Sequence, residues 1–66
     1  MEDGVYEYRQ DAMHPLVHCV KIEAGVVTDA WIYQVLGEYR SSGGWERSVI
    51  GKHADDIDLT GYVRRG

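Results

Sequence analysis

The chain has 66 residues, 44% of them hydrophobic, and a formal net charge of −4. Residues 1–66 are expected to form one small domain that buries only roughly 60% of its unfolded surface, with a net stability of about 3 to 5 kcal/mol. The acidity disfavours nucleic acid as a partner, because phosphate binding needs a dense positive field.

The first residues and the single cysteine bear on the cellular compartment in which we expect the protein. Glu2 and Asp3 are the opposite of the positively charged start of a secretion signal, and a lone Cys19 excludes an internal disulfide framework. The uncharged run at residues 30–37 is far shorter than the roughly 20 residues of a membrane helix. We therefore expect a cytoplasmic protein with no membrane span.

Residues 4–9, GVYEYR, are rich in residues that favour strands, with Tyr6 and Tyr8 on one side. Neither side is cleanly apolar, which predicts a strand at the edge of a sheet. Residues 10–15 form a loop, and Pro15 lacks the amide proton that a sheet ladder needs. The next strand therefore begins at or after Pro15.

Residues 16–36 hold most of the branched apolar residues and one turn, which predicts a β-hairpin. The turn is a three-residue loop of Glu23, Ala24 and Gly25, in which glycine can take the left-handed conformation that a G1 bulge demands. Pairing outward from this loop puts four couples on one face, the predicted core: Ile22 with Val26, Val20 with Thr28, His18 with Ala30, and Leu16 with Ile32.

The other face of this hairpin is too apolar for a plain solvent surface. We expect the sheet to curl so that part of this face is covered, and a docked partner is the alternative. Residues 29–36 also fit a helix, with Thr28 as N-cap and Gly37 after its end, but their aromatic and β-branched residues favour a strand. The residues of this face are Val17, Cys19, Lys21, Val27, Asp29, Trp31, Tyr33 and Val35.

Residues 38–50 are predicted to form a second hairpin, with its loop at 41–44 and a near-edge strand that Trp45 opens. A polar connection follows at 51–56. Residues 57–64 alternate cleanly between apolar and polar and form the fifth predicted strand. Its inward residues are Ile57, Leu59, Gly61 and Val63.

Five short strands fit a mostly β fold, an antiparallel meander curled into a small barrel or a strongly twisted sheet. The alternative is an α+β fold with three or four strands and one helix at about residues 29–40. Residues 43–51, GGWERSVIG, and 59–63, LTGYV, resemble the last strands of an SH3-type barrel. The acidic aromatic opening motif and the Pro-Ser-Asn-Tyr segment of that family are absent, so its proline-peptide groove is not carried over.

Residues that could carry chemistry are few. His14, His18, Cys19 and His53 could bind a transition metal or form a nucleophilic pair. On a strand, however, His18 and Cys19 point to opposite faces, and a cysteine inside a packed strand is more often inert.

Two short motifs also fall short of a known site. The aspartates at 55, 56 and 58 lack the glycine and closing glutamate of a calcium loop, and SSGG at 41–44 lacks the lysine of a phosphate loop. We therefore expect no enzyme activity, no catalytic residue, no metal and no cofactor.

The most suggestive feature is compositional, because tryptophan, tyrosine and arginine concentrate binding energy in protein interfaces. So small a core cannot enclose seven aromatic rings, although the rings could also build the core in the absence of phenylalanine. The predicted partner-binding residues are Tyr6, Tyr8, Trp31, Tyr33, Tyr39, Trp45, Tyr62, Arg40, Arg47 and Arg64.

The hypothesis that follows is a stand-alone protein-binding module that occupies a surface of a larger protein, as an inhibitor or an adaptor. Short acidic β-domains are common among regulatory and phage-encoded proteins. The alternative is a small nucleic-acid-binding barrel, with bases on aromatic rings and phosphates on the C-terminal arginines. Two copies of the chain could also pair through strand edges at residues 6–9 or 45–50.

Overall fold

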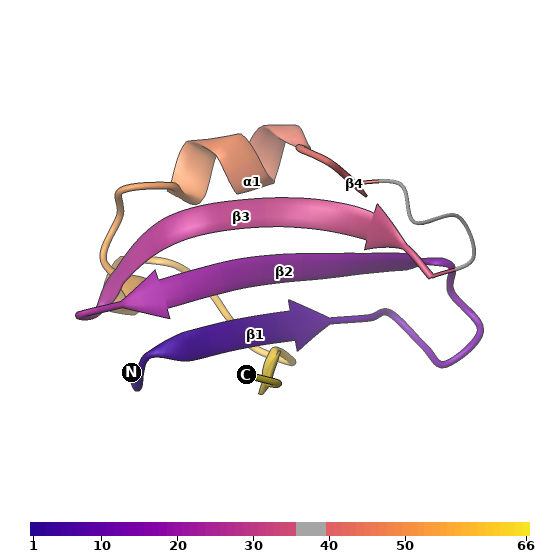
Figure 1. Ribbon diagram of the computed structural model, residues 1–66, viewed down its shortest axis with the longest axis horizontal. Helices are drawn as coiled ribbons and strands as arrows, with labels where there is room; N and C mark the ends of the chain where they lie inside the picture. Colours follow the sequence, from indigo (N-terminus) through magenta and orange to yellow (C-terminus); the bar gives the residue numbers. More distant parts are fainter. Residues whose placement is uncertain (36–39) are drawn as a thin grey trace.

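The structure, a computed structural model, describes residues 1–35 and 40–66. These residues form one antiparallel sheet with the strand order β4-β3-β2-β1-β5 (Figure 1). The predicted mostly β architecture of five antiparallel strands is confirmed. The elements are β1 (Gly4–Tyr8), β2 (Leu16–Glu23), β3 (Val26–Gln34), β4 (Arg40–Ser41), helix α1 (Gly44–Val49), the 3-10 turn η1 (Ala54–Asp56) and β5 (Val63–Arg64).

The sheet is open and not closed into a barrel. Strands β1 to β4 follow one another in space as in a meander, but β5 lies beside β1 instead of β4. Arg65 N donates to Val5 O at 2.7 Å, and Val5 N donates to Gly66 O at 2.9 Å, which fixes the C-terminal end there. Each edge strand has only two residues, too few for the two edges to pair and close a barrel.

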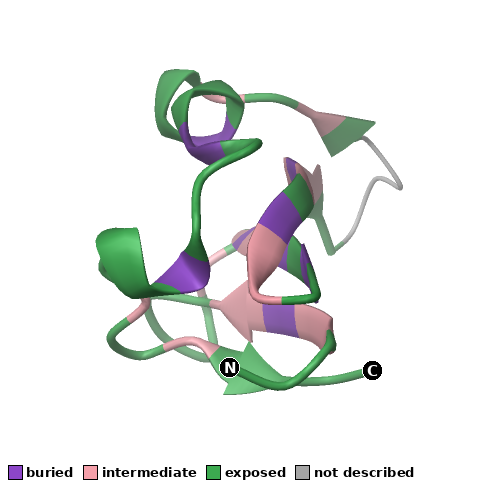
Figure 2. Ribbon diagram, turned by 90° about the vertical axis from the view of Figure 1, so that its left-hand side faces the viewer, coloured by how far each residue is buried: buried purple, intermediate pink, exposed green. Residues whose placement is uncertain are grey.

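The core lies between the sheet and a layer formed by α1 and η1, which Figure 2 shows on one side of the strands. Backbone hydrogen bonds tie this layer to β3: Val27 N donates to Lys52 O at 2.9 Å, and Gly51 N donates to Val27 O at 2.7 Å. No helix in the described ranges is long and apolar enough to cross a membrane. The buried core residues are Tyr6, Val20, Ile22, Val27, Ala30, Val49 and Ala54.

The central hairpin is present, but its loop has two residues and not the predicted three. Glu23 pairs with Val26, so the loop consists of Ala24 and Gly25. Both have positive φ, +52° for Ala24 and +77° for Gly25. Positive φ at both positions is what a type I′ turn requires, and the twist of this turn matches the twist of the strands.

A β-bulge corrects the predicted register of the hairpin. Lys21 pairs with Asp29 but Ile22 pairs with Val27, which leaves Thr28 as an extra residue. Val27 therefore faces the core, whereas the sequence predicts that Val26 and Thr28 do so. Beyond the bulge the inward residues are as predicted, but with different partners: Val20 pairs with Ala30, His18 with Ile32, and Leu16 with Gln34.

Ala24 is a poor residue for this turn, because a Cβ at φ +52° crowds the backbone. Asparagine tolerates the left-handed conformation better than alanine does. We expect Ala24→Asn to raise the free energy of unfolding by about 0.5 to 1 kcal/mol, measured by urea denaturation. Ala24→Val is the matched control and should lower it. An asparagine variant no more stable than the parent would contradict the type I′ geometry.

The strand prediction for residues 29–34 is confirmed, since β3 runs to Gln34 and pairs with β2 along its length. The alternative helix at about 29–40 is therefore wrong over this range. Val35 lies in a turn and Arg40 in β4, and residues 36–39 lie outside the described residues.

The predicted second hairpin at 38–50 is wrong. Arg40 and Ser41 form β4 and pair with β3, whereas residues 44–49, expected as a strand, form helix α1. This helix buries Glu46 and Val49, which are three residues apart and so lie on one face. Because one of the two is a glutamate, hydrophobic periodicity could not reveal the helix. The resemblance to an SH3-type barrel fails for the same reason, since its tryptophan segment is helical here.

Of the predicted fifth strand, only Val63–Arg64 is a strand. A turn interrupts the alternation before it, where Gly61 has φ +87°. The sequence predicts Val63 inward and Tyr62 outward, but the turn reverses this order. Tyr62 packs against the core, while Val63 is 51% exposed. Ile57 and Leu59 also pack against the core, as predicted, but from irregular backbone.

Part of the second face of the sheet is buried, although the sheet does not close over it. Val17 and Cys19 are only 3% and 0% exposed, although α1 and η1 both lie on the other face. On this face, Glu7 of β1 accepts hydrogen bonds from Cys19 Sγ and from Tyr33 OH of β3. Of the two strand edges expected for pairing two copies, the one at residues 6–9 is paired with β5 at residues 6 and 7, and residues 45–49 are helical and form no strand edge.

Candidate functional site

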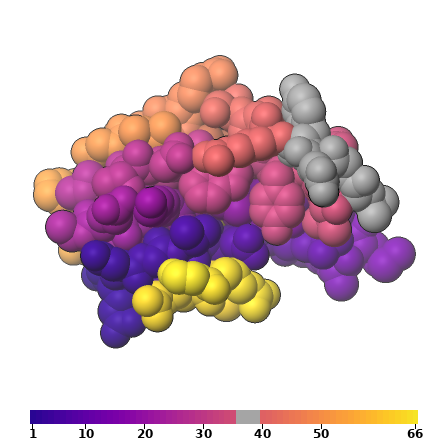
Figure 3. All heavy atoms as spheres, viewed as in Figure 1, coloured from indigo at the N-terminus to yellow at the C-terminus, as the bar shows by residue number. Residues whose placement is uncertain are grey.

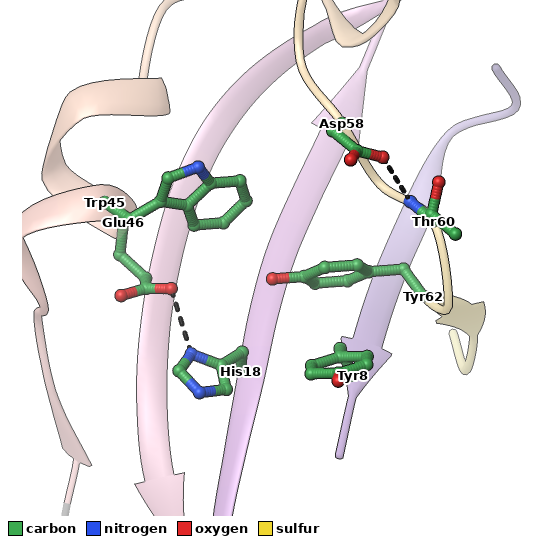
Figure 4. A pocket seen from close by; sticks show the side chains of 7 residues that line it. All are labelled: Tyr8, His18, Trp45, Glu46, Asp58, Thr60 and Tyr62. Atoms are coloured by element: carbon green, nitrogen blue, oxygen red, sulfur yellow. Dashed lines mark hydrogen bonds and ion pairs between the residues drawn. The ribbon is translucent and has the colours of Figure 1, made fainter. Parts of the chain in front are cut away.

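An open cavity of about 280 Å³ lies between helix α1 and the segment that leads into β5. We call it the aromatic groove. Figure 4 shows side chains from β1, β2, α1 and the C-terminal segment around it, with the Tyr62 hydroxyl pointing into the space bordered by Trp45, Glu46 and His18. Its lining residues are Tyr8, His18, Trp45, Glu46, Asp58, Thr60 and Tyr62.

Three rings form the apolar part of the aromatic groove. Tyr62 stacks on Tyr8 with ring centroids 5.5 Å apart, and its centroid is 6.0 Å from that of Trp45. A Cβ at Gly61 would approach the Tyr8 ring to 3.0 Å, so glycine is needed for the close passage of the chain. Trp45 is 40% exposed and remains open to a partner.

A buried carboxylate forms one wall of the aromatic groove. Glu46 is only 2% exposed, and its Oε2 lies 3.1 Å from Nδ1 of His18. An ionised carboxylate only accepts hydrogen bonds, so with an ionised Glu46 the donor in this contact is Nδ1 of His18. A Cβ at Gly43 would collide with the Glu46 carboxylate, so the glycine before α1 leaves room for it.

A second carboxylate lies at the rim of the aromatic groove, where Asp58 Oδ1 accepts a hydrogen bond from Thr60 N at 3.0 Å (Figure 4). Hydrogen bonds from Thr60 lower the pKa of Asp58 below its usual range. In the interior, burial and then the Glu46 charge raise the pKa of Tyr62 to about 12. The aromatic groove therefore has a negative rim and a neutral tyrosine at neutral pH.

The opposite face of the sheet carries a self-contained set of contacts. The Arg40 guanidinium lies over the Trp31 ring, 4.3 Å from its centroid, and Nη2 donates to Asp29 Oδ2 at 2.8 Å. Tyr33 OH donates to Glu7 Oε2 at 3.3 Å. Figure 3 shows the rose residues of β3 across the middle of the molecule and the yellow C-terminal residues against indigo β1.

A second cavity, of about 300 Å³, opens on this opposite face. Valines and a tyrosine form its apolar part, and charges border it. Glu7 and Arg65 neutralise each other across 3.6 Å, and Arg9 Nε donates to the backbone oxygen of His14 at 2.6 Å. The full lining is Glu7, Arg9, Val17, Tyr33, Val35, Gly61, Val63 and Arg65.

Cys19 lies under this face and is fully buried. Its Sγ donates to Glu7 Oε2 at 3.8 Å. Burial, reinforced by the Glu7 charge, raises the pKa of the Cys19 thiol to about 12. The thiol is therefore protonated and unreactive at neutral pH, in contrast to the low-pKa, accessible thiols that act as nucleophiles.

Alkaline pH should destabilise the fold through Cys19 and Tyr62. In the unfolded chain these groups lose their protons near pH 9 and 10, but in the folded chain only near pH 12. The folded state then binds more protons, so stability is full below pH 9 and falls by up to about 1.4 kcal/mol per pH unit and group as pH rises toward 12.

Urea denaturation between pH 8 and 11 checks this prediction. Cys19→Ala should reduce the slope of stability against pH from pH 9 upward, and Tyr62→Phe should reduce it only above pH 10. Slopes identical to that of the parent chain would contradict the raised pKa values. Slopes are compared rather than absolute stabilities, because Cys19→Ala also leaves a small cavity.

The predicted partner-binding residues do not share one surface. Tyr8, Trp45 and Tyr62 line the aromatic groove, whereas Trp31, Tyr33 and Arg40 belong to the opposite face. The remaining residues lie elsewhere: Tyr6 is in the core with its hydroxyl on Glu2 O at 2.7 Å, Arg47 donates to Ser42 O, Arg64 donates to Asp3 O, and Tyr39 lies outside the described residues.

Sequence reasoning missed four residues of the aromatic groove: His18, Glu46, Asp58 and Thr60. The Asp-x-Thr spacing of a side-chain-capped turn could have pointed to Asp58. His18 and Glu46 are 28 residues apart, and no local signal links them. Among the described residues, no three His, Cys, Asp or Glu side chains are arranged to hold a metal ion.

Comparisons of the chain with protein-family models, with curated proteins and with solved structures find no match.

Proposed function

We propose that this chain is a protein-binding module that docks onto a larger protein through the aromatic groove, as an inhibitor or an adaptor. The observation that carries the proposal is the assembly of Tyr8, Trp45 and Tyr62, from three separate segments, around an open cavity. Tryptophan and tyrosine at the centre of a desolvated pocket typically dominate the binding energy of protein interfaces.

The exposure of Trp45 supports this surface over the opposite face. On that face, the Arg40 guanidinium already lies over the Trp31 ring, and the Tyr33 hydroxyl is bound to Glu7. In the aromatic groove, Trp45 stays 40% exposed although it contacts Tyr62. A partner that covers this ring would bury apolar area at little conformational cost.

The contacts of the arginines favour a protein over a nucleic acid. Arg40, Arg64 and Arg65 each face a carboxylate, at 2.8, 3.7 and 3.6 Å respectively. Single-stranded nucleic acid needs stacking rings and cationic side chains in the same groove. The aromatic groove instead combines rings with Glu46 and Asp58, which repel phosphate.

Binding of the full chain to its partner, with variants on each face, tests the proposal. The tagged chain is used to isolate a partner from its native cell, and the purified pair is then measured by sedimentation and calorimetry. We expect a stoichiometric complex that Trp45→Ala weakens by about 30-fold, since truncation of a central aromatic residue costs about 2 kcal/mol.

The matched control is Val35→Ser, which changes an exposed apolar residue of the opposite face. This variant should bind as the parent chain does, and thermal melting should show both variants folded. Loss of binding by Val35→Ser alone would move the interface to the other face and overturn the proposal. Failure to form any stoichiometric complex would reject the module itself.

A further inference from the structure

We propose that the aromatic groove binds the guanidinium group of an arginine side chain on the partner protein, an inference that rests on the function proposed above. The groove offers three aromatic rings and two carboxylates, those of Glu46 and Asp58, in one open cavity of about 280 Å³. Aromatic faces attract cations through the quadrupole of the ring, and carboxylates accept their hydrogen bonds.

No arginine or lysine is among the described residues that line the aromatic groove. Glu46 is 2% exposed, and among the described residues its side-chain partner is His18, whose Nδ1 lies 3.1 Å from Oε2. Asp58 accepts a hydrogen bond from Thr60 N at the rim, and its side chain is exposed to solvent.

The opposite face shows how this chain satisfies the same set of groups internally. There, Trp31 and Asp29 share one cation, Arg40, whose guanidinium is 4.3 Å from the ring centroid and 2.8 Å from the carboxylate. In the aromatic groove, Trp45 and its neighbouring carboxylates present the same residue types without an arginine. A guanidinium supplied by the partner would complete the arrangement.

Arginine fits better than lysine for a geometric reason. The guanidinium is planar, so it can lie on the ring of Trp45 or Tyr62 while its edge donates to a carboxylate. An ammonium is a compact, strongly hydrated charge that cannot do both as well. The net charge of −4 also draws a basic partner toward the chain over a longer range.

Other ligand classes fit the aromatic groove less well. A phosphate or a nucleotide would place negative charge beside Glu46 and Asp58. A metal ion would need at least three converging ligands, and the described residues hold no such group. A purely apolar side chain could contact the rings but would leave the exposed Asp58 carboxylate at the rim without a cation.

The experiment is a titration of the ¹⁵N-labelled full chain, followed by NMR, with small probes that differ in the charge or the shape of the side-chain head group. N-acetyl-arginine methylamide is compared with N-acetyl-citrulline methylamide, its neutral isostere, and with N-acetyl-lysine methylamide. We expect the arginine probe to shift the indole signal of Trp45 and the backbone signals of Tyr62, and to bind at least about tenfold more tightly than the citrulline probe.

Two variants assign the effect to the aromatic groove. Asp58→Asn keeps an acceptor for Thr60 N but removes the charge, and should weaken the arginine probe several-fold while thermal melting shows that the chain remains folded. Asp29→Asn is the matched control on the opposite face and should leave the binding unchanged. Equal binding of arginine and citrulline probes, or tighter binding of the lysine probe, would overturn the assignment of a guanidinium.

The test of the guanidinium site and the test of the proposed function can fail independently of each other. If Trp45→Ala abolishes the protein complex but the arginine probe does not bind, the module stands and the guanidinium site falls. If the arginine probe binds selectively but no stoichiometric protein complex forms, the cation site stands and the proposed function falls.

Discussion

Ile22→Ala is expected to unfold this domain. Ile22 is fully buried, at 0% exposure, in the centre of the core between β2 and the helical layer. Truncation of a buried isoleucine to alanine costs about 2 to 5 kcal/mol, because the lost transfer energy is joined by the cavity left behind. A domain of this size has a net stability of only about 3 to 5 kcal/mol, so one such change can remove all of it.

Circular dichroism and thermal melting measure this effect. The variant should lose its strand signal at 25 °C or melt far below the parent chain. Val63→Ala is the matched control, because Val63 is a β-branched strand residue that is 51% exposed. It should cost less than about 0.5 kcal/mol, as exposed substitutions generally do. A folded Ile22→Ala variant with an unchanged melting temperature would refute the assigned core.

His18→Phe should destabilise the chain more than the double variant His18→Phe/Glu46→Leu. In the single variant, the Glu46 carboxylate stays buried at 2% exposure and loses the hydrogen bond from His18 Nδ1 at 3.1 Å. Leaving a buried carboxylate without its partner costs about 3 kcal/mol, whereas replacing both partners by apolar groups is often nearly neutral. The double variant should therefore recover most of the lost stability.

Urea denaturation of the parent chain, both single variants and the double variant completes a double-mutant cycle. We expect a coupling energy of about 1 to 3 kcal/mol between the two positions. A cycle in which the two effects simply add would mean that water replaces His18 at the carboxylate. The second single variant, Glu46→Leu, is expected to be mild, because His18 is 33% exposed and can turn to water.

The local signals of the central hairpin were strong enough to be read from the sequence. Gly25 fixed the place of the turn, Pro15 the start of β2, and the run of β-branched and aromatic residues the strand character of β3. The exact register could not be read, because the bulge at Thr28 has no local signature. The bulge places Val27, and not Val26 or Thr28, in the core cluster that also contains Ala54 of η1.

The nature of α1 depended on packing rather than on propensity. An isolated six-residue helix is unstable in water, so the burial of Glu46 and Val49 against β3 must provide its stability. Hydrophobic patterning treats glutamate as a surface residue and so favoured a strand. The position of β5 was equally hidden, because hydrogen bonds between Val5 and the last residues, 60 positions away, determine it.

The candidate site divides in the same way. Composition alone marked Tyr8, Trp45 and Tyr62 as residues that could bind a partner. Only the tertiary structure brought them together with His18 and Glu46, and separated them from Trp31 and Tyr33 on the other face. Alternation and turn signals act over a few residues, so the sequence by itself determined the central strands and their turn. The aromatic groove joins residues as far apart in the sequence as Tyr8 and Tyr62. Its geometry depends on which face of the sheet each side chain occupies, and this is decided by the bulge in the hairpin and by the pairing of β5 with β1.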